Sequence, residues 1–228
     1  MSLIDVARAV APAGLVPRGG FHPQPADRVP PLPEGKAPAS LILVGNVGRA
    51  MWQVFAGCAE MADGAPHALD RWTRRILGAI ADEVGATALF PFGGPPYLPF
   101  QRWAMRAEPL APSPLGILIH PDYGLWHAYR GALAFARSID LPPFAGRPRP
   151  CDSCPDKPCL SACPVGAFDG QGYDVPACIG HIDTPAGSDC MSGGCLARQA
   201  CPIGREFAYE PAQASFHMQA FRHSNRRP

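Results

Sequence analysis

The chain has 228 residues, of which 47% are hydrophobic, and a formal net charge of +1 at pH 7. This length allows one full hydrophobic core and a small second domain. The near-neutral charge argues against a broad electrostatic surface for nucleic acid. No apolar run approaches the roughly twenty residues of a membrane-spanning helix, and residues 1–5 do not open a secretory signal. We therefore expect a cytoplasmic protein without nucleic-acid or membrane partners.

The first part of the chain is predicted to alternate between helices and strands, which is typical of a layered α/β domain. Ser2 and Asp5 form a candidate capping box,. Apolar residues at helical spacing predict helices or helical turns at 3–10, 50–61, 69–84, 101–107 and 125–129. Short apolar runs predict strands at 41–44, 88–90, 116–120 and 131–136. Prolines and glycines predict extended or rigid loops at 21–39 and 91–100.

A run of closely spaced cysteines dominates the second half of the chain. Residues 151–164 read CDSCPDKPCLSACP, with cysteines at intervals of three, five and four residues and a proline after the last. Thiolates are soft ligands for iron and sulfide, and this spacing is close to the bacterial iron–sulfur pattern. The second interval is longer than usual because PDKP fills it,. We interpret it as a widened loop.

A second group of cysteines follows and also ends in a Cys-Pro pair, at Cys201. Eight cysteines in about fifty residues match two [4Fe–4S] clusters, each of which needs four thiolates. In two-cluster ferredoxins the cysteine before the proline ligates the other cluster. This rule assigns one cluster to Cys151, Cys154, Cys159 and Cys201. It assigns the other cluster to Cys163, Cys178, Cys190 and Cys195.

Zinc and disulfides are alternative interpretations of these cysteines. Zinc sites usually use two well-separated pairs with two-residue gaps, and they require neither Cys-Pro pair. One cluster together with a zinc or degenerate site is an intermediate alternative. Disulfides need an oxidising compartment. Cys58 stands apart from the other eight and is expected to be a small buried hydrophobic residue,.

Composition indicates where the chain divides. We expect the α/β domain to span 1–141 and the segment 142–150, PPFAGRPRP, to be a linker,. A small ferredoxin-like domain with two clusters is then expected at 151–210. The remaining residues, 211–228, are expected to form a C-terminal tail that frays at its basic end.

The segment 116–135, GILIHPDYGLWHAYRGALAF, carries a distinctive order of residues. A strand ends in a His-Pro pair, and an aromatic residue, a glycine, a tryptophan and an Arg-Gly pair follow: His120, Tyr123, Gly124, Trp126 and Arg130. This order resembles the cobalamin-processing proteins of the CblC type. The cysteine half resembles that of epoxyqueuosine reductases, which join a related cobalamin-binding domain to two four-iron clusters.

The CblC resemblance implies a flavin-reductase-like sheet with helices, and a corrinoid bound against His120, Tyr123, Gly124 and Trp126. Gln101 and Trp103 offer further walls for an apolar cleft. Each of these residues also has a structural interpretation. His120 would cap local backbone, and the aromatic residues would belong to the core.

Together the two resemblances imply an iron–sulfur corrinoid reductase or processing protein, in which clusters deliver single electrons to cobalt. The reaction would reduce the metal or remove its upper ligand reductively, with a corrinoid and an electron-donor protein as partners. The chain departs from epoxyqueuosine reductases at 128–131 and matches no catalytic aspartate of that family, so tRNA is not the expected substrate. A non-enzymatic dicluster electron carrier and a flavin-dependent reductase are the alternatives.

Overall fold

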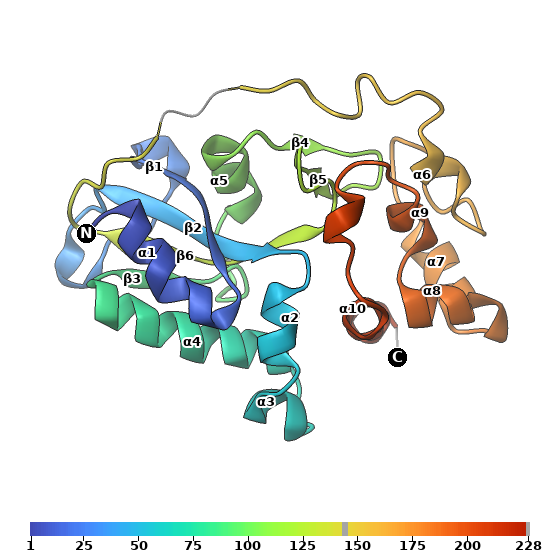
Figure 1. Ribbon diagram of the computed structural model, residues 1–228, viewed down its shortest axis with the longest axis horizontal. Helices are drawn as coiled ribbons and strands as arrows, with labels where there is room; N and C mark the ends of the chain where they lie inside the picture. Colours follow the sequence, from blue (N-terminus) through green and yellow to red (C-terminus); the bar gives the residue numbers. More distant parts are fainter. Residues whose placement is uncertain (143–145, 227–228) are drawn as a thin grey trace. The chain divides into compact units, whose positions relative to one another are not determined.

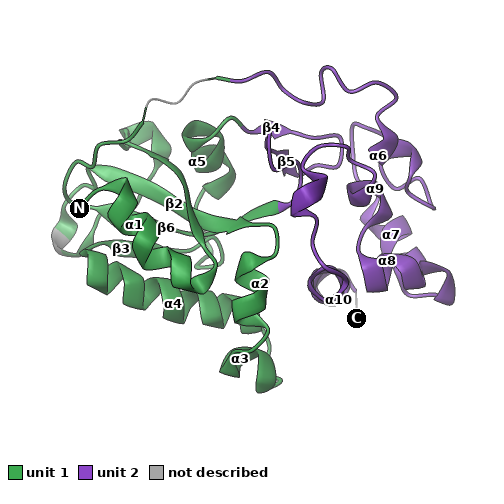
Figure 2. Ribbon diagram, in the orientation of Figure 1, with its two compact units in different colours: residues 1–109, 127–146 green, residues 110–126, 147–228 purple. Residues whose placement is uncertain are grey.

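The computed structural model describes residues 1–142 and 146–226, which divide into two compact units (Figures 1 and 2). Unit 1 takes residues 1–109 and 127–146, and unit 2 takes residues 110–126 and 147–228. Residues 110–126 therefore belong to the cysteine-rich unit, whereas the sequence placed them in the N-terminal domain. Residues 143–145 of the expected linker lie outside the described residues.

Unit 1 is built on a four-stranded sheet in the order β1-β2-β6-β3. The strands are β1 (Val16–Phe21), β2 (Ser40–Val47), β3 (Thr87–Leu89) and β6 (His127–Phe135). All three neighbouring pairs are antiparallel, so the fold is α+β and not the alternating α/β arrangement expected from the order of elements,. The apolar run of β2 is completely buried, which explains its strength as a sequence signal,.

Helices surround this sheet. They are α1 (Leu3–Val10), α2 (Ala50–Phe55), α3 (Ala59–Ala62), α4 (Ala68–Val84) and α5 (Phe100–Ala107). The capping box predicted for Ser2 and Asp5 is confirmed at the start of α1. α4 buries Trp72, Leu77 and Val84 and packs against β3 and β6, while α5 packs along β1 and β2 (Figure 1).

Two local predictions for unit 1 were wrong. The helix expected at 50–61 divides into α2 and α3 around Gly57, which is consistent with the low helix propensity of glycine. The helical turn expected at 125–129 is instead the beginning of β6 at His127. The sequence also failed to indicate β1, because its residues VPRGGF contain a proline and two glycines that weaken any strand pattern,.

Unit 2 consists mainly of short elements. They are β4 (Ala111–Pro112), β5 (Leu118–Ile119), α6 (Pro158–Ser161), α7 (Val175–Ile182), α8 (Ser188–Gly193), α9 (Leu196–Gln199) and α10 (Pro211–Asn225). β4 and β5 pair antiparallel, so the strand predicted at 116–120 survives as two residues of a small separate sheet. Short 3₁₀ turns across the two units lie at Ala11–Ala13, Pro25–Asp27, Pro33–Gly35, Pro185–Gly187 and Arg205–Phe207.

The expected C-terminal tail is instead a helix. α10 packs against α7 and α8, and Arg226 donates from Nη2 to Asp183 Oδ1 at 2.7 Å. Residues 227 and 228 lie outside the described residues. The aromatic and amide residues within α10 carry too weak a helical stripe to be recognised from the sequence,.

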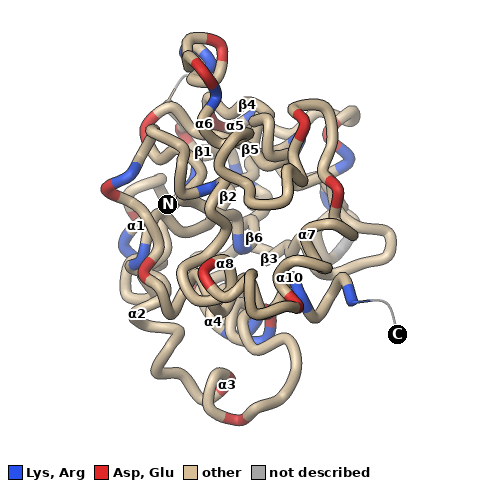
Figure 3. Tube along the Cα trace, turned by 90° about the vertical axis from the view of Figure 1, so that its right-hand side faces the viewer, with Lys and Arg blue, Asp and Glu red and all other residues tan. Residues whose placement is uncertain are grey.

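Charge is mixed along the chain. In the described part of the molecule, positions of Lys and Arg are interspersed with positions of Asp and Glu (Figure 3). Among residues 1–142 and 146–226, no helix combines the length and the apolar character needed to cross a membrane.

A buried ion pair ties β1 of unit 1 to the end of α5. Arg18, only 1% exposed, donates from Nε and Nη2 to the two carboxylate oxygens of Glu108, at 3.0 and 2.7 Å. The Tyr129 hydroxyl donates to the same carboxylate. Such two-pronged pairing satisfies a guanidinium in a buried position.

Replacing Glu108 with glutamine is expected to lower the free energy of unfolding by about 3–5 kcal/mol, because it leaves the Arg18 charge buried and unpaired. Urea unfolding of the wild-type protein and the variant measures this change in the free energy of unfolding. Arg8→Gln is the matched control, since the Arg8–Asp5 pair is 3.9 Å long and the Arg8 side chain is 79% exposed. This control should change stability by less than about 0.5 kcal/mol. Equal losses of stability in Glu108→Gln and Arg8→Gln would show that the buried Arg18–Glu108 pair stabilises the fold no more than an exposed pair.

Candidate functional site

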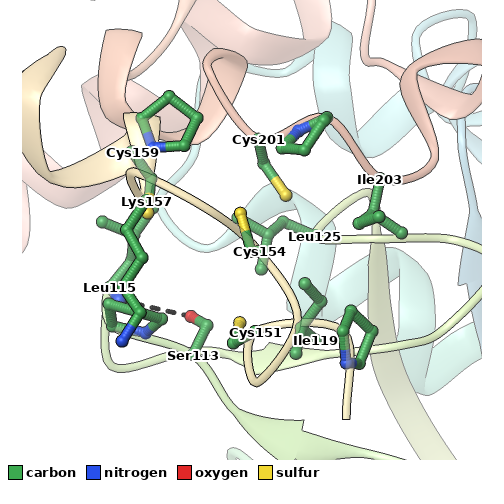
Figure 4. Close-up of a pocket in the computed structure, with 14 residues that line it drawn as sticks. Ser113, Leu115, Ile119, Leu125, Cys151, Cys154, Lys157, Cys159, Cys201 and Ile203 are labelled. Atoms are coloured by element: carbon green, nitrogen blue, oxygen red, sulfur yellow. Dashed lines mark hydrogen bonds between the residues drawn. The ribbon is translucent and has the colours of Figure 1, made fainter. Parts of the chain in front are cut away.

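Four cysteines of unit 2 line one cavity, shown in Figure 4: Cys151, Cys154, Cys159 and Cys201. The sulfur atoms of Cys151, Cys154 and Cys201 face the same space in that view. Leu115, Ile119, Leu125 and Ile203 form much of the remaining wall, together with prolines. The arrangement offers four soft sulfur ligands inside an apolar enclosure.

Local structure explains how a distant cysteine joins the first three. Cys159 lies in α6, a single turn that begins at Pro158, and Cys201 lies two residues after the end of α9. α6 and α9 pack against each other, and the Cys201 N–H donates to the Arg198 carbonyl at 3.2 Å. Pro202 has no N–H and cannot continue the helix. The chain therefore turns away at this point and leaves Cys201 at the cavity.

The other four predicted ligands, Cys163, Cys178, Cys190 and Cys195, form a second set. Cys178 lies in α7, Cys190 in α8, and Cys195 caps the start of α9. Burial raises the pKa of Cys178, and the charges of Cys163 and Cys190 raise it further. Burial also raises the pKa of Cys195, again reinforced by Cys178 and Cys190. The grouping of these four cysteines as the ligands of one cluster stays a prediction.

The electrostatics of the first set favour a cationic occupant. Burial raises the pKa of Cys151, Cys159 and Cys201, and the charge of at least one other thiol of the set raises each further. Four thiolates would repel one another in this enclosure unless a positive centre lay among them. Iron supplies that charge and prefers thiolate ligands together with sulfide, so the donor set fits an iron–sulfur cluster.

Tyr173 is a candidate functional residue that the sequence did not indicate. Burial raises the pKa of its hydroxyl, and a hydrogen bond to Cys178 raises it further. Its ring stacks on Phe168 with centroids 4.4 Å apart and on Phe221 at 5.9 Å. A tyrosine a few residues before a cysteine ligand was the available signal. The hydroxyl therefore lies beside Cys178, one of the predicted ligands of the second set.

The predicted corrinoid-contacting segment lies in unit 2, beside the first cysteine set. His120 and Gly124 each donate a backbone N–H to the other's carbonyl at 2.9 Å. Gly124 has a φ of +56°, and a Cβ there would lie 2.0 Å from the carbonyl oxygen of Ile203. The turn therefore packs directly on the loop that follows Cys201.

His120 is 5% exposed and takes part in local capping. Its Nδ1 accepts the Asp122 N–H at 3.0 Å, and its ring stacks on Tyr123 with centroids 4.2 Å apart. Tyr123 in turn meets the edge of Phe207 at 5.2 Å. These contacts match the structural interpretation of His120, and its role toward a corrinoid stays a prediction.

Leu125 and Trp126 extend the same segment toward the second cysteine set. The Leu125 carbonyl accepts the Nε–H of Arg198 at 3.1 Å. The Arg198 guanidinium lies 4.7 Å from the centre of the Trp126 ring and 4.5 Å from that of Tyr209. Trp126 and Arg198 line a second cavity that includes Cys195, whereas Leu125 lines the first. The segment thus touches the surroundings of both sets.

Gln101 and Trp103 lie in α5 of unit 1. Trp103 is 1% exposed, and its indole N–H donates to the Asp27 carbonyl at 2.8 Å. Its ring meets Phe100 with centroids 4.9 Å apart. Trp103 therefore contributes to the core of unit 1, and Gln101 is exposed. Their role as walls of a corrinoid cleft stays a prediction.

Cys58 remains apart from the other eight cysteines, in unit 1 at the start of α3. It is partly exposed, which corrects the expectation that it is buried.

In the residues that the structure describes, no three His, Cys, Asp or Glu side chains are arranged for a single metal ion.

Replacing Gly124 with alanine is expected to destabilise unit 2 by at least about 1–2 kcal/mol, because a side chain at positive φ carries that cost, and the Cβ would also collide with Ile203. Hydrogen exchange across residues 110–126 measures the change. Gly116→Ala is the matched control, since Gly116 also has a positive φ of +74° but has nothing within 4 Å of the added Cβ. A similar loss of protection in both variants would show that the contact with Ile203 contributes nothing.

Comparisons with known proteins relate the fold to solved structures and a short stretch of the sequence to a known protein. No family model matches the chain. A ferredoxin-type protein NapG of Haemophilus influenzae is 53% identical over 34 residues, a match that covers 15% of this chain and 12% of that protein. The chain thus spans about an eighth of the length of this curated relative.

Solved structures resemble the whole chain. A selenomethionine-labelled epoxyqueuosine reductase matches 93% of this chain and 67% of its own, with a TM-score of 0.51 and 16% identity. The epoxyqueuosine reductase of Streptococcus thermophilus covers 92% and 69%, with a TM-score of 0.51 and 13% identity. The B12-trafficking protein CblC of C. elegans covers 96% and 95%, again with a TM-score of 0.51 and 13% identity. These likenesses show a shared α+β fold.

Proposed function

We propose that this protein is an iron–sulfur reductase or processing protein for a corrinoid, and that it holds two [4Fe–4S] clusters. The observation that carries the proposal is the cavity lined by four thiols, against which the turn at His120–Gly124 packs. The segment expected to contact the corrinoid is thereby held next to the segment expected to bind a cluster. Short separation is what one-electron transfer between two cofactors requires.

The residues of unit 2 have distinct tasks in this proposal. The first set of thiolates holds one cluster and the second set holds the other; when bound, the clusters supply single electrons. Leu115, Ile119 and Leu125 keep water from the first cavity. The Ala167 N–H donates to Cys163 Sγ at 3.3 Å and fixes the position of that sulfur.

The corrinoid part of the proposal is supported by two observations. The residue order from His120 to Trp126 resembles CblC-type proteins, and a CblC protein shares the fold over 96% of this chain. Trp126 and Tyr209 supply aromatic surface beside the second cavity. We expect the substrate to be a cobalamin whose cobalt is reduced or whose upper ligand is removed.

A second candidate function is that of an electron carrier without an enzymatic reaction. The short match to a ferredoxin-type protein over 34 residues favours it, because ferredoxins carry electrons on clusters held by cysteine thiolates,. In this case both clusters would bind, but no corrinoid would.

A titration of anaerobic, iron-loaded protein with cobalamin distinguishes the two functions. The reductase is expected to bind with a shifted visible corrin spectrum and to accelerate cobalt reduction by a photoreduced donor. A Cys201→Ala variant, expected to lack one cluster, should bind cobalamin but reduce it more slowly. Absence of binding at concentrations well above typical cofactor affinities would overturn the corrinoid function and leave the electron carrier.

A further inference from the structure

Lysine is rare in this chain. The 20 basic Lys and Arg residues include two lysines, Lys36 and Lys157, and the others are arginines. Lys157 lies in the widened interval between Cys154 and Cys159 and forms part of the wall of the four-thiol cavity (Figure 4). Lys157 thus lies in a cysteine interval that is longer than usual, and it is a lysine in a chain whose basic residues are mostly arginines.

The backbone of the widened interval is tightly constrained. Asp156 and Lys157 both adopt positive φ, +56° and +37°, which is costly for residues other than glycine and persists where the surrounding structure holds it. The Lys157 N–H donates to the Pro155 carbonyl at 2.6 Å, and the Lys157 carbonyl accepts the Leu160 N–H at 2.9 Å. The loop therefore holds the backbone of Lys157 in one conformation at the wall of the cavity.

Lys157 places a positive charge at the wall of the first cavity. It lines that cavity together with Cys151, Cys154, Cys159 and Cys201. The second cavity, which includes Cys195, has Arg198 in its wall, and the Arg198 guanidinium lies over the rings of Trp126 and Tyr209.

We propose that Lys157 tunes the reduction potential of the cluster held by the first cysteine set, keeping it higher than the same site would have without this charge. The inference rests on the proposed function, because it requires a cluster in this cavity. Reduction adds one negative charge to a cluster, and a nearby cation stabilises the reduced form more than the oxidised form. Lys157 is exposed, so dissolved salt screens part of the effect,.

The test is a redox titration of anaerobic, cluster-loaded protein, followed by electron paramagnetic resonance. In Lys157→Met we expect the equilibrium constant for reduction of one cluster to fall about tenfold, equivalent to about 59 mV for one electron. The other cluster should keep its potential. Lys157→Arg preserves the charge and should retain both potentials, and Lys36→Met is the matched control for loss of a lysine in unit 1. The affected signal should be the one that a Cys163→Ala variant retains.

Acylation provides a second route that removes the charge of Lys157 after the protein has folded, without substituting Lys157. In Lys36→Met protein, Lys157 is the remaining lysine, so acetylation of the loaded protein neutralises its ammonium group after the clusters are in place. The same potential should fall, and the fall should shrink as ionic strength rises. Unchanged potentials after acetylation, with iron content intact, would overturn the role of Lys157 and leave the proposed function standing. Failure of wild-type protein to hold two clusters would overturn both.

Discussion

Replacing Cys201 with alanine is expected to remove the same cluster as replacing Cys159 with alanine, although the two cysteines lie far apart in the sequence. Both thiols line one cavity together with Cys151 and Cys154. Loss of any of the four leaves an incomplete ligand set and places water beside iron. Each variant should therefore contain about half of the wild-type iron and lack the same paramagnetic signal.

Alanine at Cys163 or Cys195 should remove the other signal, because these thiols belong to the second set, with Cys178 and Cys190. Cys58→Ala is the matched control and should keep all the iron, since Cys58 lies in unit 1. Iron analysis and electron paramagnetic resonance of anaerobic samples make the comparison. If Cys201→Ala and Cys163→Ala lost the same signal, the proline-linked exchange of ligands between the two clusters would be wrong.

Removing the iron is expected to open unit 2 while unit 1 stays folded. The first cavity has apolar walls around four thiols. Apart from the 15-residue α10, the α-helices of unit 2 have four to eight residues and little stability of their own,. When the protein binds a metal centre, the free energy of binding contributes directly to the free energy of folding. Hydrogen exchange should show protection falling by at least about a hundredfold in unit 2, equivalent to about 2.7 kcal/mol.

The loss of hydrogen-exchange protection should extend to both segments of unit 2. Residues 110–126 should lose protection together with residues 147–226, because both segments form unit 2. β2 provides the internal control, since its residues 41–44 are completely buried in unit 1. Retained protection in 110–126 after iron removal would show that this segment folds with unit 1.

The sequence predicted elements whose signal is local. Apolar residues at helical spacing predicted α4, and a capping box predicted the start of α1. In both cases a few neighbouring residues carry the whole signal. The grouping of the cysteines into two ligand sets stays a prediction, which rests on their order along the chain.

Features that depend on distant partners were not predictable. The lack of space for a side chain at Gly124 is explained by Ile203, far along the chain, and nothing near residue 124 indicates that contact. The burial of Arg18 depends on Glu108 in the same way. The antiparallel order of the sheet and the assignment of residues 110–126 to unit 2 are likewise set by packing between segments, which periodicity does not report.

Each of the two units is made of two separate segments of the chain. The polypeptide enters unit 2 after residue 109, returns to unit 1 at residue 127 and enters unit 2 again at residue 147. A gene fragment beginning at residue 151 would encode all eight clustered cysteines but omit Leu115, Ile119 and Leu125 from the wall of the first cavity. Neither half can be cut out as one continuous piece, so recombination that exchanged a cysteine-rich cassette at this boundary would produce an incomplete cavity.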